Sequence, residues 1–371
     1  MTPLQAEALR IYRETGNRTE TARRMGKSRA TVRALIDKAE AWEAASPGRR
    51  DAAMASNIDL GEAGIAWIKT DADGNVTGRS QMVKPIKAQD DPAKIIEAIR
   101  DGLAGIAPAG SVPEPVSVPD ICAVFPVADL HMGLLTDAEE VGEDWDGKKA
   151  KRVFEETFGR LVAVTPNAGT AILAQLGDLT HTDDQRNVTP QSGHQLDADS
   201  RYFMILRRAV AAMKAGIDML REKYPRVIYR GCRGNHDITA HYAVTLALAE
   251  HYRDIEGVEI IDHAGEFYAH EFGRNMLLLH HGDKAKPERL VHFAAAEWPE
   301  MWGRTRHRLA LSGHIHHATA REIGGMTLES VGTIIPRDAY AHSHGYSARR
   351  GLVSITLHRT QGEISRARIG L

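Results

Sequence analysis

The sequence predicts an α/β protein that carries a small all-helical segment ahead of its main domain. From about residue 120 onward, short apolar segments alternate with longer amphipathic ones, which is typical of an α/β domain with buried sheets. The first 45 residues show helical periodicity alone. The length of 371 residues suggests two or three domains, and 43% hydrophobic with 26% charged residues excludes disordered, collagen-like and coiled-coil chains.

Residues 1–45 are expected to form a helix-turn-helix domain. Gly16 and Gly26 can end two short helices, because glycine adopts the left-handed conformation found past a helix C-terminus. Thr19 and Ser28 are expected to cap the second and third helices. Apolar residues follow helical spacing in the first and third helices: Leu4, Ala8, Leu9, Tyr12, Val32, Leu35, Ile36 and Ala39. Three short helices with glycine-containing turns are typical of a helix-turn-helix.

Residues 46–106 are expected to be a small α+β connecting segment. It contains a candidate hairpin at 65–83 with its turn at 71–75, and a candidate helix at 93–103. Residues 107–119 read APAGSVPEPVSVP, and their four prolines favour an extended linker. The main domain is therefore expected to span residues 120–371.

Within the main domain, candidate strands and helices alternate along the chain. The candidate strands lie at 121–128, 170–176, 226–230, 276–280 and 309–311. The candidate helices lie near 148–164, 200–223, 239–253 and 286–301, and the second of them has an apolar stripe at 3–4 spacing.

Polar residues follow the end of each candidate strand. The five segments are Asp129-Leu130-His131, Gly177-Asp178, Gly234-Asn235-His236-Asp237, His280-His281-Gly282 and Gly313-His314-Ile315-His316. Ligands of open α/β folds bind beyond the carboxyl ends of the strands, so these segments are expected to converge on one crevice. The histidine distribution agrees, since 15 of the 18 histidines fall from His236 onward and none precedes His131.

These residue types indicate a metal site. Carboxylate, imidazole and amide-oxygen ligands together suit divalent ions such as Mn²⁺, Fe²⁺, Zn²⁺ or Ni²⁺. Asp-x-His and His-x-His would put two side chains on the same side of an extended segment, where both can bind one ion. Glycines 177, 234, 282 and 313 would allow sharp turns and close backbone approach. Two such ions about 3.5–4 Å apart can hold a bridging water, lower its pKa and bind a phosphoryl group.

The five ordered segments resemble the pattern of the calcineurin-like metallophosphoesterases: D-x-H, G-D, G-N-H-D/E, H and G-H-x-H. The resemblance covers about residues 120–320 and implies a four-layer αββα sandwich. It implies that Asp129, His131 and His316 hold one metal, that Asn235, His281 and His314 hold the other, and that Asp178 bridges them. His236 would protonate the leaving oxygen as general acid. The implied cofactor is a pair of divalent ions, with Mn²⁺ favoured and Fe²⁺, Zn²⁺, Ni²⁺ or Mg²⁺ as alternatives.

The second segment indicates a branch within this family. It reads GDLTH, which places His181 three positions after Asp178, where the protein Ser/Thr phosphatases carry an aspartate. DLHMG and GDLTH look more like the SbcD-type DNA-repair nucleases. We therefore expect His181 to be a catalytic residue, with a ligand or a partner of His236 as the alternatives. The combination of a helix-turn-helix, a linker and a phosphoesterase also resembles proteins encoded by phages and prophages.

Candidate substrate contacts come from the polar residues near the metal segments. The long polar stretch 179–196 supplies Arg186, Asn187, Thr189 and His194, and Arg233 lies beside Asn235. The candidate DNA contacts are Arg29, Thr31 and Arg33 for bases, and Arg23, Arg24 and Lys27 for phosphates. The first fifty residues hold eleven basic and six acidic residues, which favours a polyanionic partner.

The leading hypothesis is a dinuclear metal-dependent phosphodiesterase that acts on nucleic acid, as a DNA nuclease with a metal-bridging hydroxide as nucleophile. Two alternatives remain open: a phosphoesterase for small or cyclic nucleotides, and a DNA-binding regulator whose phosphoesterase domain is vestigial. The sequence shows no secretory signal and no apolar run near 18 residues, and it has only two cysteines, Cys122 and Cys232. A cytoplasmic protein without a membrane partner is therefore expected, and the oligomeric state is not readable.

Overall fold

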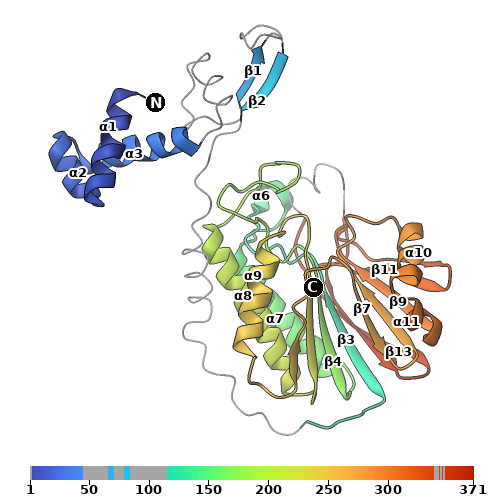
Figure 1. Ribbon diagram of the computed structural model, residues 1–371. Coiled ribbons are helices and arrows are strands. Elements are labelled where there is room, and N and C mark those ends of the chain that lie inside the picture. The colour runs from blue at the N-terminus through green and yellow to red at the C-terminus, as the bar shows by residue number, and fades with distance from the viewer. Residues whose placement is uncertain are drawn as a thin grey trace. The chain divides into compact units, whose positions relative to one another are not determined.

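The computed structural model describes residues 2–44, 66–70, 79–83, 115–337, 342, 345 and 347–371 (Figure 1). The chain divides into two compact units, Met1–Asp91 and Pro92–Leu371, which we treat separately. The candidate helix at 93–103, the turn at 71–75 and most of the linker at 107–119 lie outside the described residues. No helix among the described residues is long and apolar enough to cross a bilayer.

The N-terminal unit begins with three helices, α1 (Pro3–Thr15), α2 (Arg18–Met25) and α3 (Arg29–Ala44). Gly16 and Gly26 follow the first two helices with φ of 60° each, as expected. The Ser28 hydroxyl accepts from the Thr31 amide at 3.1 Å, which is the expected cap of α3. The expected Thr19 cap is wrong: the Asn17 side chain accepts from the Thr19 and Glu20 amides instead. Asn at position 17 makes the capping bond two residues before the expected position.

The three helices share one small apolar core, built from the periodic positions of the sequence. Its buried members are Ala8, Leu9, Ala22, Val32, Ile36 and Ala39. In the same unit, β1 (Ala66–Thr70) pairs antiparallel with β2 (Arg79–Val83), in agreement with the expected hairpin.

The second unit contains a six-stranded sheet in the order β13-β12-β3-β4-β5-β6. Its parallel strands are β3 (Ile121–Val127), β4 (Thr170–Leu176), β5 (Val227–Cys232) and β6 (Val258–Ile260). β12 (Gly351–His358) joins β3 antiparallel, and β13 (Gly362–Gly370) joins β12 antiparallel. Helices α7 (Gly147–Val164), α8 (Tyr202–Arg221) and α9 (Ala240–His251) occupy the connections between the parallel strands, and the short α6 (Ala138–Val141) precedes α7.

A second sheet of five strands has the order β10-β11-β9-β8-β7. Its strands are β7 (Tyr268–Phe272), β8 (Asn275–Leu279), β9 (His307–Ser312), β10 (Thr319–Ile323) and β11 (Met326–Ser330). The expected helix at 286–301 is instead two helices, α10 (Pro287–Glu297) and α11 (Pro299–Arg304). Trp298 separates them with φ −122° and ψ 59°, because the residue before a proline is driven out of the helical region.

Three buried hydrophobic clusters hold these elements together, and they follow from the alternation of side chains along strands. Phe125 of β3 faces α7 and α8 in the first cluster, whereas its neighbour Val124 faces the second sheet in the second cluster. In the third cluster, Leu278 of β8 packs against Leu290 of α10. Accordingly, α7, α8 and α9 lie on one side of the sheets and α10 and α11 on the other (Figure 1).

Candidate metal centre

The five polar segments lie together at the carboxyl ends of β3, β4, β5, β8 and β9. Backbone hydrogen bonds continue across these ends: Asp129 N–H donates to the Gly177 carbonyl at 3.1 Å, and His131 N–H donates to the Asp178 carbonyl at 2.9 Å. In the second sheet, Gly313 N–H donates to the His281 carbonyl at 2.8 Å. Since β3, β4 and β5 are parallel to one another, as are β8 and β9, the convergence expected from the sequence occurs.

The backbone at the ligand positions is in the left-handed region. Among the described residues, six non-glycine residues have positive φ, and five of them are candidate ligands: Asp129 (53°), His131 (38°), Asp178 (50°), His314 (71°) and His316 (58°). The expectation that Asp-x-His and His-x-His are extended is therefore wrong. Left-handed conformations cost energy for residues with a Cβ, so their concentration at one edge is typical of a functional site.

Two glycines make room for the carboxylates of the site. A Cβ at Gly313 would lie 2.6 Å from Asp129 Oδ2, and a Cβ at Gly234 would overlap the Asp178 carboxylate. Any side chain at these two positions would displace a candidate ligand, which explains why glycine stands there.

The first group of candidate ligands consists of Asp129, His131 and His316. His131 Nε2 lies 3.2 Å from His316 Nε2, and His316 Nε2 lies 3.7 Å from Asp129 Oδ1. Both Asp129 oxygens also accept from the His314 amide, at 3.1 and 3.0 Å, and the Thr333 hydroxyl donates to the Asp129 carbonyl at 2.7 Å. The group is thus fixed by contacts with the segments that follow β9 and β11.

The second group contains Asn235, His281 and His314. His281 Nε2 lies 3.0 Å from Asn235 Oδ1, and the His281 and His314 ring centres are 5.0 Å apart. His281 Nδ1 donates to the Leu176 carbonyl at 2.8 Å, which leaves its Nε2 as the atom that can bind a metal.

Asp178 lies between the two groups. Its Oδ2 is 3.7 Å from His131 Nε2 of the first group and 3.3 Å from His281 Nε2 of the second. Its other oxygen accepts from the His236 amide at 2.8 Å. The carboxylate expected to bridge two metals therefore has contacts on both sides.

The spacing of these atoms fits divalent ions. Two ligands bonded at about 2.1 Å to one ion stand about 3.0 Å apart at a right angle and about 3.4 Å apart at a tetrahedral angle. The donor atoms here lie 3.0–3.7 Å from one another. Ligand atoms of Asp129, His131 and His316 all lie within 4.8 Å of each other, and so do those of Asp178, His281 and His314. The geometry and donor chemistry are compatible with divalent metal binding.

The electrostatics of the centre are strongly perturbed by burial and mutual contact. Burial raises the pKa of Asp129 and lowers the pKa of His131 well below its usual value. Burial alone would raise the pKa of Asp178, but His281 and other neighbouring histidines hold it well below its usual value. Burial would lower the pKa of His281, but the Asp178 carboxylate raises it to about 10. The centre thus holds anionic oxygens and imidazoles in the low-dielectric setting in which cations bind strongly.

Asp237 is a positioning residue whose role the sequence did not reveal. Its fully buried carboxylate accepts from the Gly234 and Leu179 amides at 2.7 Å each and from the Asp178 amide at 3.2 Å. It therefore joins the segment after β4 to the segment after β5. The only sequence signal was its place as the last residue of the Gly-Asn-His-Asp segment.

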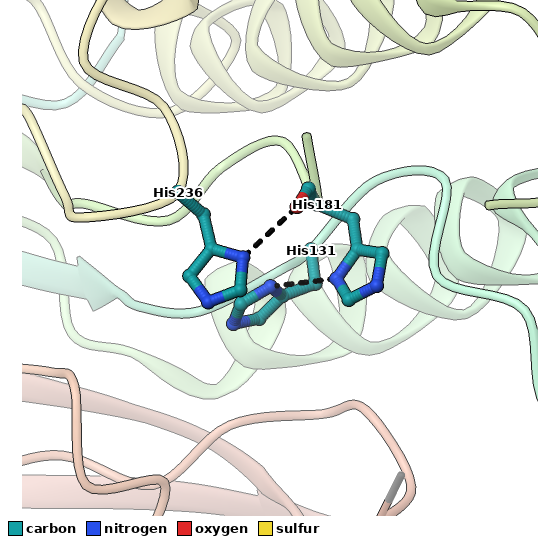
Figure 2. Close-up of side chains that lie close together, drawn as sticks. All are labelled: His131, His181 and His236. Atoms are coloured by element: carbon teal, nitrogen blue, oxygen red, sulfur yellow. Dashed lines mark hydrogen bonds between the residues drawn. The ribbon is translucent and has the colours of Figure 1, made fainter. Parts of the chain in front are cut away.

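His181 and His236 lie beside the first group (Figure 2). His236 Nδ1 donates to the His181 carbonyl at 2.9 Å, so its Nε2 remains available for substrate. His181 Nδ1 lies 3.2 Å from His131 Nδ1, and burial lowers the pKa of His181 to about 3. His131, His181 and His236 also form a third cluster that could hold a metal. The structure thus places His181 in contact with both a candidate ligand and the candidate acid.

The candidate substrate contacts have local partners of their own. Arg233 is paired with Glu266 and Arg186 with Asp184. Asn187 has φ 52° and its carbonyl accepts from Gln195 Nε2 at 3.0 Å. The two remaining candidate contacts lie in segment 179–196, where Thr189 is buried and His194 is exposed. Segment 179–196 contains local bonds of this kind, and its Asp184 is already paired with Arg186, one of the groups expected to contact substrate.

Two side chains near the ligands are structural. His280 is buried and stacks on Phe267 with ring centres 5.7 Å apart, on the face of β8 away from His281. Cys232 is fully buried, and burial raises the pKa of its thiol to about 12, which disfavours the nucleophilic thiolate.

Comparison with known proteins gives no sequence family, since no family model and no curated protein matches the chain. Among solved structures, a predicted phosphoesterase from Streptococcus pneumoniae is 13% identical, with 68% of this chain and 100% of that one covered and a TM-score of 0.27. An archaeal phosphodiesterase is 11% identical, with 67% and 99% covered and a TM-score of 0.31. The phosphoesterase Yfce from E. coli is 14% identical, with 66% and 98% covered and a TM-score of 0.27. This chain is similar to these phosphoesterases at low sequence identity.

Proposed function

We propose that the α/β domain is a dinuclear metal-dependent phosphodiesterase that acts on nucleic acid as a DNA nuclease. The observation that carries this proposal is the gathering of seven candidate ligands from five separated segments at one edge of the two sheets. Donor atoms of six of them make contacts of 3.0–3.7 Å, and His314 has a ligand atom within 4.8 Å of those of Asp178 and His281. The αββα architecture of the calcineurin-like family is the one that the three buried clusters favour.

Each residue of the centre has a defined part in this proposal. Asp129, His131 and His316 would hold one ion, Asn235, His281 and His314 the other, and Asp178 would contact both. When bound, a pair of divalent ions polarises the phosphoryl group and lowers the pKa of a water that serves as nucleophile. The mixed oxygen and nitrogen donors are compatible with Mn²⁺ in this role, and Fe²⁺, Zn²⁺ and Ni²⁺ are the alternatives.

His236 supplies the proton for the leaving oxygen. Its Nδ1–H is fixed on the His181 carbonyl, which orients the ring and directs Nε2 away from that contact (Figure 2). His181 remains a neutral imidazole, because burial keeps its pKa near 3, and it holds His131 in place through the 3.2 Å contact. The GDLTH segment that provides His181 supports the SbcD-like nuclease branch.

The N-terminal helices deliver the enzyme to DNA in this proposal, with Arg29, Thr31 and Arg33 of α3 directed to bases. Lys27 and Arg29 are exposed, which leaves them accessible to a phosphate backbone. Arg23 and Arg24 are paired with Glu20, so they would have to exchange this partner for phosphates. The Thr31 hydroxyl lies 2.8 Å from Ser28 Oγ, so its methyl group is the part free for a base.

An activity screen tests the proposed reaction and separates it from the two alternatives. Plasmid DNA, single-stranded DNA and bis-p-nitrophenyl phosphate are each incubated with Mn²⁺ and with a chelator. We expect metal-dependent cleavage of all three substrates. Cleavage of the small diester without cleavage of DNA would support a small-nucleotide phosphoesterase instead. DNA binding without any turnover would support a regulator with a vestigial domain.

The proposed role of His236 as general acid is tested by comparing diesters that differ in their leaving group. His236→Ala should slow hydrolysis of a diester with a poor alkoxide leaving group by about 10²–10⁴-fold, which is typical of a lost general acid. Hydrolysis of a diester with a p-nitrophenolate leaving group should be affected far less, because that anion needs no proton. An equal loss with both substrates would contradict the role of His236.

A further inference from the structure

A hollow lined by arginines lies beside β12 and β13. It has a volume of about 540 Å³, and Arg349, Arg350 and Arg368 line it together with the backbone around Gly332 and Gly351. None of its lining residues is acidic. We call it the arginine hollow.

The strand register places the arginine hollow at the metal edge of the sheet. β12 pairs with β3 from His358 opposite Ile121 to Ile355 opposite Val124. Continued along both strands, this register puts Gly351 level with Ala128, the residue before Asp129. Arg368 of β13 pairs with Val353 of β12, so it lies two residues, or about 7 Å, along the strand from that level and two strands away from β3.

Two further contacts connect the hollow to the ligands. Ala318, which lines the hollow, follows His316 by two residues, a separation of at most about 7 Å. Gly332 is followed by Thr333, whose hydroxyl donates to the Asp129 carbonyl at 2.7 Å. The hollow therefore borders the first ligand group.

Two of the three guanidinium groups have no ion-pair or hydrogen-bond partner among the described residues. Arg350 donates to the Ile334 carbonyl at 2.8 Å and is paired with Glu143. Arg349 and Arg368 are exposed, and neither side chain forms an ion pair or hydrogen bond with the residues that the structure describes. Two free positive charges in a hollow whose lining side chains carry no carboxylate favour a phosphate, because guanidinium groups bind phosphate oxygens through paired hydrogen bonds.

We propose that the arginine hollow binds a phosphate that flanks the scissile diester on the same polynucleotide strand. This inference rests on the proposed function. Strands in a sheet are about 4.8 Å apart, so Arg368 lies roughly 10 Å to the side of the end of β3. A nucleic-acid strand carries one phosphate per about 3.4 Å of helix rise, so the phosphate over the hollow would be two or three nucleotides from the cleaved bond.

The test compares a substrate that has flanking phosphates with one that has none. Wild-type protein and the Arg349→Ala/Arg368→Ala variant are assayed with Mn²⁺ on a single-stranded hexanucleotide and on bis-p-nitrophenyl phosphate. We expect KM for the hexanucleotide to rise about tenfold and kcat/KM for the small diester to stay unchanged, since two phosphate contacts are lost. Arg349→Lys/Arg368→Lys should restore most of the affinity, because it keeps both charges.

A binding measurement gives a readout that does not require turnover. Fluorescence anisotropy of a labelled hexanucleotide in a chelator should show the same loss of affinity. Its log–log salt dependence should become less steep by about 0.7, the value for one phosphate that the protein no longer neutralises on a single strand. Arg160→Ala/Arg253→Ala is the matched control, because it removes two exposed arginines from the C-terminal end of α7 and just past α9, and it should change neither quantity.

The outcomes separate this inference from the proposed function. Absence of diester hydrolysis by the wild-type protein would overturn the proposed function, and the anisotropy comparison would still decide whether the hollow binds the strand. Hydrolysis of both substrates with unchanged hexanucleotide KM and unchanged salt dependence in the double alanine variant would overturn the hollow alone. An equal loss in the charge-matched control would overturn it too.

Discussion

Replacing Asp237 by asparagine tests how the centre is held together. The Asp237 carboxylate accepts three backbone amides, from Gly234 and Asp178 on Oδ1 and from Leu179 on Oδ2. An asparagine must direct its NH₂ group at one of these two positions, whichever way its amide is turned. At least one buried N–H then faces another donor, in a segment that carries Asp178 or Asn235.

The size of the effect follows from that lost bond. A buried donor left without an acceptor costs about 1–3 kcal/mol. Residues that orient metal ligands typically change metal affinity 10–100-fold, which corresponds to about 1.4–2.8 kcal/mol. Since the two ranges agree, we expect Asp237→Asn to weaken Mn²⁺ binding 10–100-fold without removing any ligand.

The assay is a competition titration of Mn²⁺ against a chelating indicator. It is run at pH 8, because burial and the neighbouring Asp178 raise the pKa of Asp237 to about 7 in the metal-free protein. Asp146→Ala is the control, since Asp146 accepts the Lys149 amide at 2.7 Å as the cap of α7. That control should lower the free energy of unfolding by about 1 kcal/mol, the typical effect of a lost helix cap, and leave metal affinity unchanged. A folded Asp237→Asn protein with wild-type Mn²⁺ affinity would refute the reasoning.

Three further outcomes are expected. Asp178→Asn should abolish turnover and lower the metal content measured by elemental analysis, because it removes the carboxylate that contacts both ligand groups; full activity would reject the assignment. Metal binding at pH 8 should release about one proton per chain from His281, because its pKa near 10 keeps it protonated without metal, and metal affinity should therefore rise with pH. Calorimetry in buffers of different ionisation enthalpy measures the released protons, and equal heats in all buffers would contradict this prediction. Deletion of residues 1–118 should spare hydrolysis of a small diester and weaken DNA affinity and its salt dependence; unchanged affinity would remove the role given to α1, α2 and α3.

The elements with the strongest periodicity were predictable from the sequence, and their local exceptions were not. β4 matches its expected range of 170–176, because a seven-residue apolar run bounded by turn residues has the length of a strand and is short for a helix. The cap of α2 fell on Asn17 instead of Thr19, since both residue types can cap a helix and only the backbone decides between them. The break at Trp298 depended on Pro299, which also fits the first turn of a helix.

The candidate ligands were predictable because each follows the end of a strand, and strand ends at one edge meet in space. The conformation that brings them together was not predictable from residue type. Asp129 and His316 have left-handed backbones, which residues with a Cβ adopt only when surrounding contacts impose it. The role of Asp237 could not be predicted, because it depends on which amides face its carboxylate. These amides belong to two segments about 58 residues apart along the chain.

The arginine hollow was less predictable from the sequence than the ligands were. Arg349 and Arg368 carry no motif, and only the register of β12 with β3 places the hollow that they line toward the end of β3 that carries Asp129. That register joins segments more than 200 residues apart, and a shift by one residue would turn the strand's side chains to the opposite face.

The most direct test of the account is the number and coupling of the bound ions. The full-length protein is dialysed against Mn²⁺, its metal content is measured, and its electron paramagnetic resonance spectrum is recorded. We predict two ions per chain with an exchange-coupled spectrum, because Asp178 contacts both ligand groups at 3.7 and 3.3 Å. A single isolated ion, or no bound ion, would contradict the dinuclear centre on which the proposed reaction depends.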